Sequence, residues 1–205
     1  MTFRTAVVFG AASLPAAGCG GSVDRVAAPP WNSSALEEAV FSRLDADGND
    51  ELSRQETAAA PGLAWGFERA DADRNGVLSR AELQARFALY EASRLGLTVQ
   101  DFQLTSNGRP LAAGKVRFVP EFFVAELLEP AEAEILPGGT VGPSIAGSSL
   151  PGMRPGFYRV VVEEAQPPVP AAYGSAEATT LGVEVAPAAT DRASYGVIQL
   201  KIQGK

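Results

Sequence analysis

Two acidic loops of twelve residues, 45–56 (the first loop) and 71–82 (the second loop), carry the side chains best suited to chemistry in this chain. In each loop, oxygen-bearing groups recur at the first, third, fifth, seventh, ninth and twelfth positions. A hard dication such as Ca²⁺ takes about six to eight oxygen ligands at about 2.4 Å, and this spacing lets a tightly wound loop supply them. The predicted ligands are, in the first loop, Asp45, Asp47, Asn49, the carbonyl of Glu51, Ser53 and Glu56, and, in the second loop, Asp71, Asp73, Asn75, the carbonyl of Val77, Ser79 and Glu82.

The sixth position distinguishes the two loops. Gly76 occupies it in the second loop, where the backbone must take a positive φ, but the first loop has Asp50. Aspartate adopts left-handed backbone at a cost of about 1 kcal/mol relative to glycine, so we expect the second loop to bind its ion more tightly. Leu52 and Leu78 occupy the eighth positions, and we expect them to pair across a short two-stranded bridge that joins the loops into one unit.

Helical patterns flank both loops. Residues 34–37 form a capping-box sequence, and Leu36, Val40 and Leu44 follow at helical spacing, so a helix is expected to lead into the first loop. Between the loops we expect a short helix over 57–60 and another over 63–70. After the second loop, one helix face is expected to carry Leu83, Phe87 and Tyr90, with Glu82, Arg86 and Glu91 near solvent and Gly96 at the helix end.

This helix–loop–helix pattern, present twice within residues 34–96, resembles a shortened EF-hand pair. The resemblance implies that the bound ion is Ca²⁺ and that residues 34–96 form one domain. The alternative is that each loop is only a solvated acidic turn. Two tandem matches at the expected helix ends favour metal binding.

The amino terminus has the features of an export signal. Residues 1–4 are weakly basic, residues 6–14 are apolar, and small residues precede Cys19, the single cysteine of the chain. Residues 1–18 resemble a bacterial lipoprotein signal peptide, which implies that Cys19 is lipidated and that residues 19–33 form a linker. An ordinary secretory signal is the alternative. In both cases we expect an exported protein, and with lipidation one anchored to the membrane of the cell envelope.

Composition argues against several classes of function. The chain has no histidine, which removes the common general base and the usual transition-metal ligand, so we expect no enzyme. Lysine and arginine number 17 against 24 acidic residues, a net charge of -7 with no concentrated basic face. Nucleic-acid binding is therefore not expected, whereas the acidity suits calcium.

Residues 97–205 change to a strand-like pattern with Gly and Pro between short apolar runs. Asn107-Gly108 predicts a hairpin turn between the first two strands, and the series predicts an antiparallel β-sandwich, making the chain an α+β protein. Strands are expected over 99–104, 116–119, 140–145, 157–162, 180–185 and 197–202. Residues 121–134 are expected to hold a short helix within a sandwich loop, or alternatively a surface that docks a partner.

Three segments carry a second resemblance. Residues 107–111, 114–121 and 155–160, the last reading Pro-Gly-Phe-Tyr-Arg-Val, are similar to carboxypeptidase-regulatory or transthyretin-like β-modules of exported bacterial proteins, and residues 173–185 resemble planctomycete-type envelope lipoproteins. The resemblance implies a scaffold without catalytic residues. We expect Phe157, Val160 and Val162 in its core and Tyr158 and Arg159 near solvent.

Together these patterns predict a calcium-binding envelope lipoprotein whose EF-hand pair is structural or acts as a sensor. The alternative is an adhesion or carrier module, in which the β-sandwich binds a protein or glycan partner and the EF-hands serve as a stabilising neck.

Overall fold

The computed structural model describes residues 26–187 and 196–203. The predicted signal peptide over 1–18 and the predicted lipidation of Cys19 lie outside the described residues. Within the described part, the four α-helices and the short strands β1 and β2 come first along the chain and the two larger sheets follow, so the expected α+β class is confirmed. The helical part consists of α1 (Ser33–Leu44), β1 (Glu51–Ser53), α2 (Arg54–Thr57), α3 (Pro61–Ala70), β2 (Val77–Ser79) and α4 (Arg80–Ser93).

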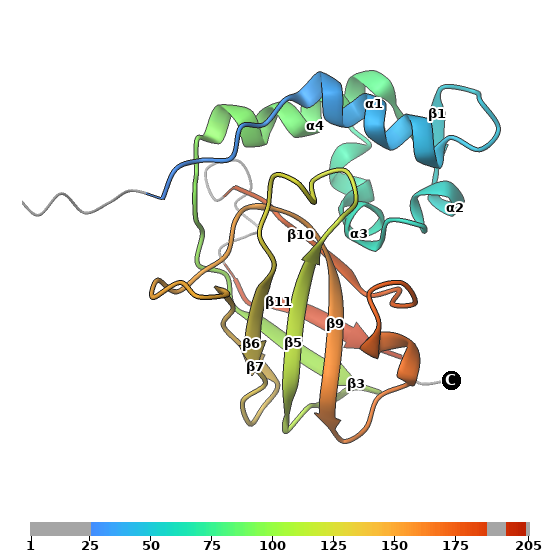
Figure 1. The fold of residues 1–205 in the computed structure, drawn as a ribbon. Helices are drawn as coiled ribbons and strands as arrows, with labels where there is room; N and C mark the ends of the chain where they lie inside the picture. The colour runs from blue at the N-terminus through green and yellow to red at the C-terminus, as the bar shows by residue number, and fades with distance from the viewer. Residues whose placement is uncertain (1–25, 188–195, 204–205) are drawn as a thin grey trace, which may run out of the picture.

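Two sheets follow the helices and form the lower part of the molecule in Figure 1. The first sheet has the strand order β10-β9-β5-β6-β8, and the second has β11-β3-β4 with β7 also paired to β3. Phe102 of β3 and Phe118 of β5 lie with ring centroids 4.7 Å apart, which joins the two sheets through a shared core. The elements are β3 (Phe102–Ser106), β4 (Arg109–Pro110), β5 (Ala113–Pro120), β6 (Ala131–Glu134), β7 (Thr140–Val141), β8 (Ser144–Ile145), β9 (Gly156–Gln166), the 3-10 helix η1 (Ala171–Gly174), β10 (Gly182–Val185) and β11 (Ile198–Ile202).

Strand pairing departs from the expected pattern in three places. The turn at Asn107 and Gly108, both with positive φ, returns the chain into β4, whereas residues 116–119 belong to β5 in the other sheet. Residues 140–145 divide between β7 and β8, which join different sheets. Strand β11 pairs with β3 in parallel, so the second sheet is not wholly antiparallel.

The helix predicted within residues 121–134 is absent from the structure. Residues 122–127 form successive turns, and Ala131–Glu134 is strand β6. The apolar residues of this segment instead fill the space between helices and sheet: the Phe123 ring lies 5.6 Å from that of Phe87 in α4 and 5.5 Å from that of Phe157 in β9. Phe123 therefore contacts a helix and a strand at once, whereas an amphipathic helix would bury its apolar residues on a single face.

One hydrophobic core runs from the helices into the sheets. Leu83, Phe87 and Tyr90 of α4 are buried as predicted, and Tyr90 stacks at 4.6 Å on Trp31, which lies in the predicted linker. Figure 1 shows the helices gathered at one end of the strands, with α3 lying against β10. Phe157, Val160 and Val162 of β9 are also buried as predicted.

Several predicted surface residues are buried. Tyr158 is fully buried and donates a hydrogen bond from its hydroxyl to the carbonyl of Arg154. The Arg159 side chain is only 19 % exposed and pairs with Glu121, and Arg86 is buried against Glu184. The two arginines were placed wrongly because the carboxylate that each one meets is distant in the sequence. Tyr158 is buried because its ring packs in the core, where its centroid lies 6.4 Å from that of Phe118.

Helix ends also differ from the predictions. The α1 helix begins at Ser33 because the Asn32 side chain, not Ser34, accepts the capping hydrogen bond from Ala35 N–H at 3.1 Å. Helix α4 ends at Ser93 and is capped by Arg94 in the left-handed conformation, whereas the helix end was predicted at Gly96. The helix predicted over 57–60 is not formed, because α2 covers Arg54–Thr57 and residues 58–60 form a turn and a bend. Helix α3 begins at Pro61, two residues earlier than predicted.

Helix α3 contacts the first sheet through glycines. A Cβ added at Gly62 would lie 2.7 Å from the backbone nitrogen of Tyr158, and one at Gly66 would lie 2.5 Å from Oε2 of Glu184. Gly182 of β10 lies equally close to the backbone of Pro61. Only residues without a side chain allow this approach of helix to sheet.

We therefore predict that Gly62→Ala destabilises the protein by about 1 to 3 kcal/mol, because the methyl group displaces backbone in a packed interface. Helix propensity alone would give the opposite sign, a gain of roughly 0.5–1 kcal/mol. Urea unfolding measures the change. Gly196→Ala is the control, since a Cβ there meets no atom within 4 Å and should leave the unfolding free energy nearly unchanged.

Candidate metal centres

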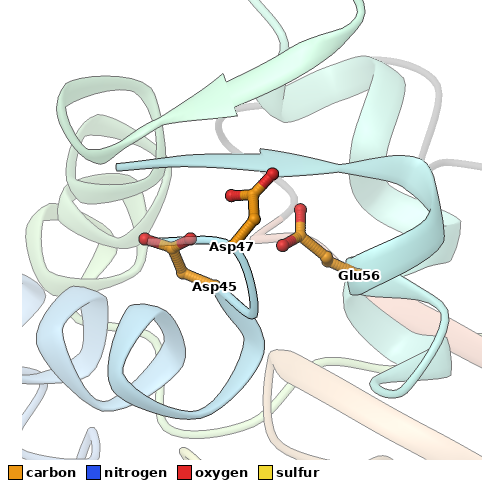
Figure 2. Close-up of side chains that lie close together, drawn as sticks. All are labelled: Asp45, Asp47 and Glu56. Atoms are coloured by element: carbon orange, nitrogen blue, oxygen red, sulfur yellow. The ribbon is translucent and has the colours of Figure 1, made fainter. Parts of the chain in front are cut away.

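The first loop connects α1 to α2 and brings three carboxylates together. Asp45 caps the end of α1, Asp47 follows in the loop, and Glu56 lies in α2. One carboxylate oxygen from each residue lies within 4.8 Å of the other two. Figure 2 shows the three side chains converging on one small volume between the loop and the start of α2.

The second loop repeats the arrangement between α3 and α4. Asp71 caps the end of α3, and one carboxylate oxygen each from Asp71, Asp73 and Glu82 again lie within 4.8 Å of one another. Asp71 is buried, whereas its counterpart Asp45 is partly exposed. The structure thus brings together the first, third and twelfth residues of both loops.

Local hydrogen bonds shape both loops in the same way. Asp71 accepts from the backbone N–H of Asn75 and of Gly76 at 3.1 Å each, and the amide oxygen of Asn75 accepts from Val77 N–H at 2.9 Å. In the first loop, Asp45 accepts from the N–H groups at the equivalent positions, Asn49 and Asp50, and Asn49 accepts from Glu51 N–H at 2.7 Å. Short polar side chains that bond their own backbone favour such turns.

The twelfth residue of each loop is held by a capping box. Ser79 Oγ donates to Glu82 Oε2 at 2.7 Å and accepts from Glu82 N–H, while Glu82 Oε1 accepts from Ala72 N–H at 2.9 Å. Ser53 and Glu56 make the same contacts in the first loop. Each glutamate therefore reaches back across its loop and connects the twelfth residue to the backbone of the second.

These contacts favour the charged glutamates. Hydrogen bonds from the backbone and hydroxyl of Ser53 lower the pKa of Glu56 below its ordinary value of 4.5. Burial acts to raise the pKa of Glu82, but its hydrogen bonds from Ser79, Asp73 and Ala72 together outweigh burial and lower it. Both carboxylates are accordingly ionised at neutral pH.

A two-stranded bridge joins the loops. Strands β1 and β2 pair antiparallel with Leu52 opposite Leu78, as predicted, and both leucines are fully buried. Glu51 and Val77, whose carbonyl oxygens are predicted ligands, are the first residues of these strands. The bridge fixes the two loops relative to each other.

Arg80 makes a second connection that the sequence pattern did not reveal. It follows Ser79 in the second loop, and its Nε donates to Asp50 of the first loop at 2.8 Å. The guanidinium also pairs with Glu37 and Glu38 of α1 and lies 4.4 Å from the ring centroid of Phe41. The hydrogen bonds that Arg80 donates to the carboxylates of Asp50 and Glu37 raise the pKa of Arg80. Asp50 takes the left-handed conformation, φ 60°, that the sixth position requires. Its carboxylate pairs with Arg80, a contact that a glycine at this position would lack.

The donor set suits a hard divalent cation. Each cluster offers carboxylate oxygens and neither histidine nor cysteine, and three negative charges within 4.8 Å repel one another unless a cation lies between them. The two clusters could therefore each hold a metal ion.

Comparison with known proteins finds no matching family model, and neither a curated protein nor a solved structure matches the chain. Within the described ranges, no helix combines the length and apolar composition needed to cross a bilayer.

The capping serines give a prediction about acid stability. Because the folded-state pKa values of Glu56 and Glu82 are lowered, their hydrogen bonds stabilise the fold above the ordinary glutamate pKa of 4.5, and this contribution is lost as pH falls through the folded-state values. In chelator at neutral pH, Ser79→Ala should cost about 1 kcal/mol.

Thermal unfolding of the wild type and of the Ser53→Ala/Ser79→Ala double variant from neutral pH to about pH 3 measures the effect. We expect the gap in Tm between them to narrow on acidification. A gap that is constant across this range would contradict the assigned hydrogen bonds.

Proposed function

We propose that this chain binds two calcium ions through an EF-hand pair formed by the first and second loops. The observation that carries the proposal is the repetition of one geometry: two carboxylate triads, each with oxygens within 4.8 Å, built by the same backbone contacts and joined by the Leu52–Leu78 bridge. Coincidental acidic turns have no reason to share a hydrogen-bond pattern residue by residue.

Calcium fits the loops better than its competitors. A glutamate at the twelfth position offers two oxygens, and the loop supplies further oxygens from Asp, Asn and backbone groups, which meets the demand of Ca²⁺ for roughly six to eight oxygen ligands. Mg²⁺ prefers strict octahedral geometry and retains several waters. Zn²⁺ and copper favour nitrogen and sulfur ligands, which both clusters lack.

The role that we propose for calcium is structural. A calcium sensor works by moving the helices of each hand apart, but α3 is fastened to the first sheet. The fully buried Glu121 accepts a hydrogen bond from Gly62 N–H at 2.7 Å at the start of α3, and its other oxygen pairs with Arg159 of β9 at 3.0 Å. Opening this hand would expose a buried ion pair and the glycine-lined contact of α3 with the sheet.

We further propose that the chain works outside the cytoplasm as a lipid-anchored envelope protein and is not an enzyme. Support comes from the export signal pattern ahead of Cys19 and from the absence of histidine in the sequence. Outside the cell calcium is commonly plentiful. The loops would therefore stay occupied and keep the flanking helices in a fixed relative orientation.

The calcium site itself is tested by Glu82→Gln. The variant removes one charge from the second triad, and we expect calorimetric titration of the metal-free chain to lose the heat of the tighter site. Glu91→Gln is the matched control, since Glu91 is exposed on the same helix α4 and its loss changes net charge equally. Identical heats for wild type and Glu82→Gln would refute the assignment.

One observation favours the alternative of a protein- or glycan-binding module. A groove of about 830 Å³ lies on the outer face of the first sheet, with exposed Lys115 and Arg117 of β5 facing Glu132 and Glu134 of β6. A ligand of this groove would still bind to the Glu56→Gln/Glu82→Gln double variant and would be lost in Arg117→Glu. A ligand that depends on the calcium loops would show the reverse pattern.

A further inference from the structure

Glu184 of β10 is a fully buried carboxylate in the interface between the helices and the first sheet. Its Oε1 accepts hydrogen bonds from Arg86 Nε at 2.7 Å and from the Tyr90 hydroxyl at 2.6 Å. Its Oε2 lies 3.9 Å from Nη1 of Arg69. A buried carboxylate persists only when such partners compensate for its lost hydration, so the contacts hold these groups in one arrangement.

The partners of Glu184 come from both sides of the second loop. Arg69 lies in the last turn of α3, two residues before Asp71, and Arg86 lies one helical turn after Glu82 in α4. Tyr90 follows one turn later on the same helix. Burial, with the Glu184 charge beside it, holds the pKa of the Tyr90 hydroxyl well above its ordinary value, so the hydroxyl remains a donor. A single side chain of the sheet thus contacts the helix that enters the loop and the helix that leaves it.

We propose that Glu184 is a positioning residue for the second metal loop. By fixing the ends of α3 and α4 against β10, it sets the separation of Asp71 from Glu82 and prepares the loop for its ion before binding. The inference rests on the proposed calcium function and deepens it. The higher calcium affinity that we expect of the second loop then depends on the contacts of α3 and α4 with the sheet as well as on Gly76.

The first loop has a different surrounding. Helix α2, which carries Glu56, has only four residues and packs on α3 and β1. Asp45 at the start of the first loop is partly exposed, whereas Asp71 is buried. Loss of Glu184 should therefore affect the second loop and leave the first loop almost unchanged.

The substitution Glu184→Gln also changes net charge and stability, and both effects need a control. Removing a carboxylate lowers the negative charge of the protein, and removing any buried ion-pair member lowers its stability. Glu121→Gln matches Glu184→Gln in both respects, because Glu121 is equally buried, pairs with an arginine and contacts α3. Glu121 contacts α3 at Gly62, near the start of the helix, whereas Asp71 follows the end of the helix. Glu121 therefore does not contact the helix ends on either side of the second loop. Tyr90→Phe removes the hydrogen bond between Tyr90 of α4 and Glu184 without any change of charge.

The test is calorimetric titration of the full chain with calcium in two backgrounds, with Tm recorded for every protein. Glu56→Gln isolates the second loop and Glu82→Gln isolates the first. In the Glu56→Gln background, we expect Glu184→Gln to weaken calcium affinity by about fivefold or more and Tyr90→Phe to weaken it in the same direction. Glu121→Gln should lower Tm yet change affinity less than about twofold. In the Glu82→Gln background, Glu184→Gln should leave affinity unchanged.

Failure of the positioning role can be told from failure of the calcium site. If the Glu56→Gln parent takes up no calcium, the proposed function is wrong and this inference is overturned with it. If the parent binds calcium and Glu184→Gln binds it equally well, only the inference is overturned. If Glu121→Gln and Glu184→Gln weaken calcium affinity equally, the positioning role of Glu184 is also overturned. Should Glu184→Gln not fold, Tyr90→Phe decides: weakened affinity supports the positioning role, and unchanged affinity overturns it.

Discussion

Two fully buried carboxylates of the β part, Glu121 and Glu184, hold the helical part in place. Moving a carboxylate out of water is strongly unfavourable, and each of these glutamates is compensated by an arginine at 2.7–3.0 Å and by a further hydrogen bond. Glu184 meets Arg86 and Tyr90, and Glu121 meets the N–H of Gly62, only when α3 and α4 lie against the sheet, whereas the arginine that pairs with Glu121 lies in β9 itself. A shift of the helices would therefore remove hydrogen bonds from both buried carboxylates and the arginine partner from Glu184.

Glycines make that interface possible. Gly62 and Gly66 bring α3 against the backbone and side chains of the sheet, and Gly182 removes the side chain that would stand between β10 and Pro61. Aromatic rings fill the neighbouring space, where Phe87, Phe123 and Phe157 meet from a helix, a turn and a strand. Close backbone approach and ring packing together give the two parts of the chain one continuous core.

Within the helical part, the loops are stabilised on a smaller scale. Capping boxes and side-chain bonds to backbone act within ten residues, and the β1–β2 bridge and Arg80 then join one loop to the other. Asp50 shows how the two scales interact. Judged alone, it is a poorer turn residue than glycine, but its carboxylate binds Arg80 across the pair, a contact that compensates for part of the backbone cost.

The sequence alone predicted the features that depend on neighbouring residues. The spacing of Asp71, Asp73 and Glu82, the pairing of Leu52 with Leu78 and the buried face of α4 all follow from turn and helix periodicity, which acts over a few residues. Arg86, Tyr158 and Arg159 were placed wrongly near solvent, and residues 116–119 were paired with the wrong strand. Each error has one cause: the residue that decides the position is distant in the sequence and unspecified by local pattern, as Glu184 is for Arg86 at a separation of 98 residues and Phe118 is for the ring of Tyr158. Local hydrogen bonding determined the shape of the two acidic loops, and only the tertiary structure decided what holds the flanking helices, because burial of charge depends on partners that meet after the chain has folded.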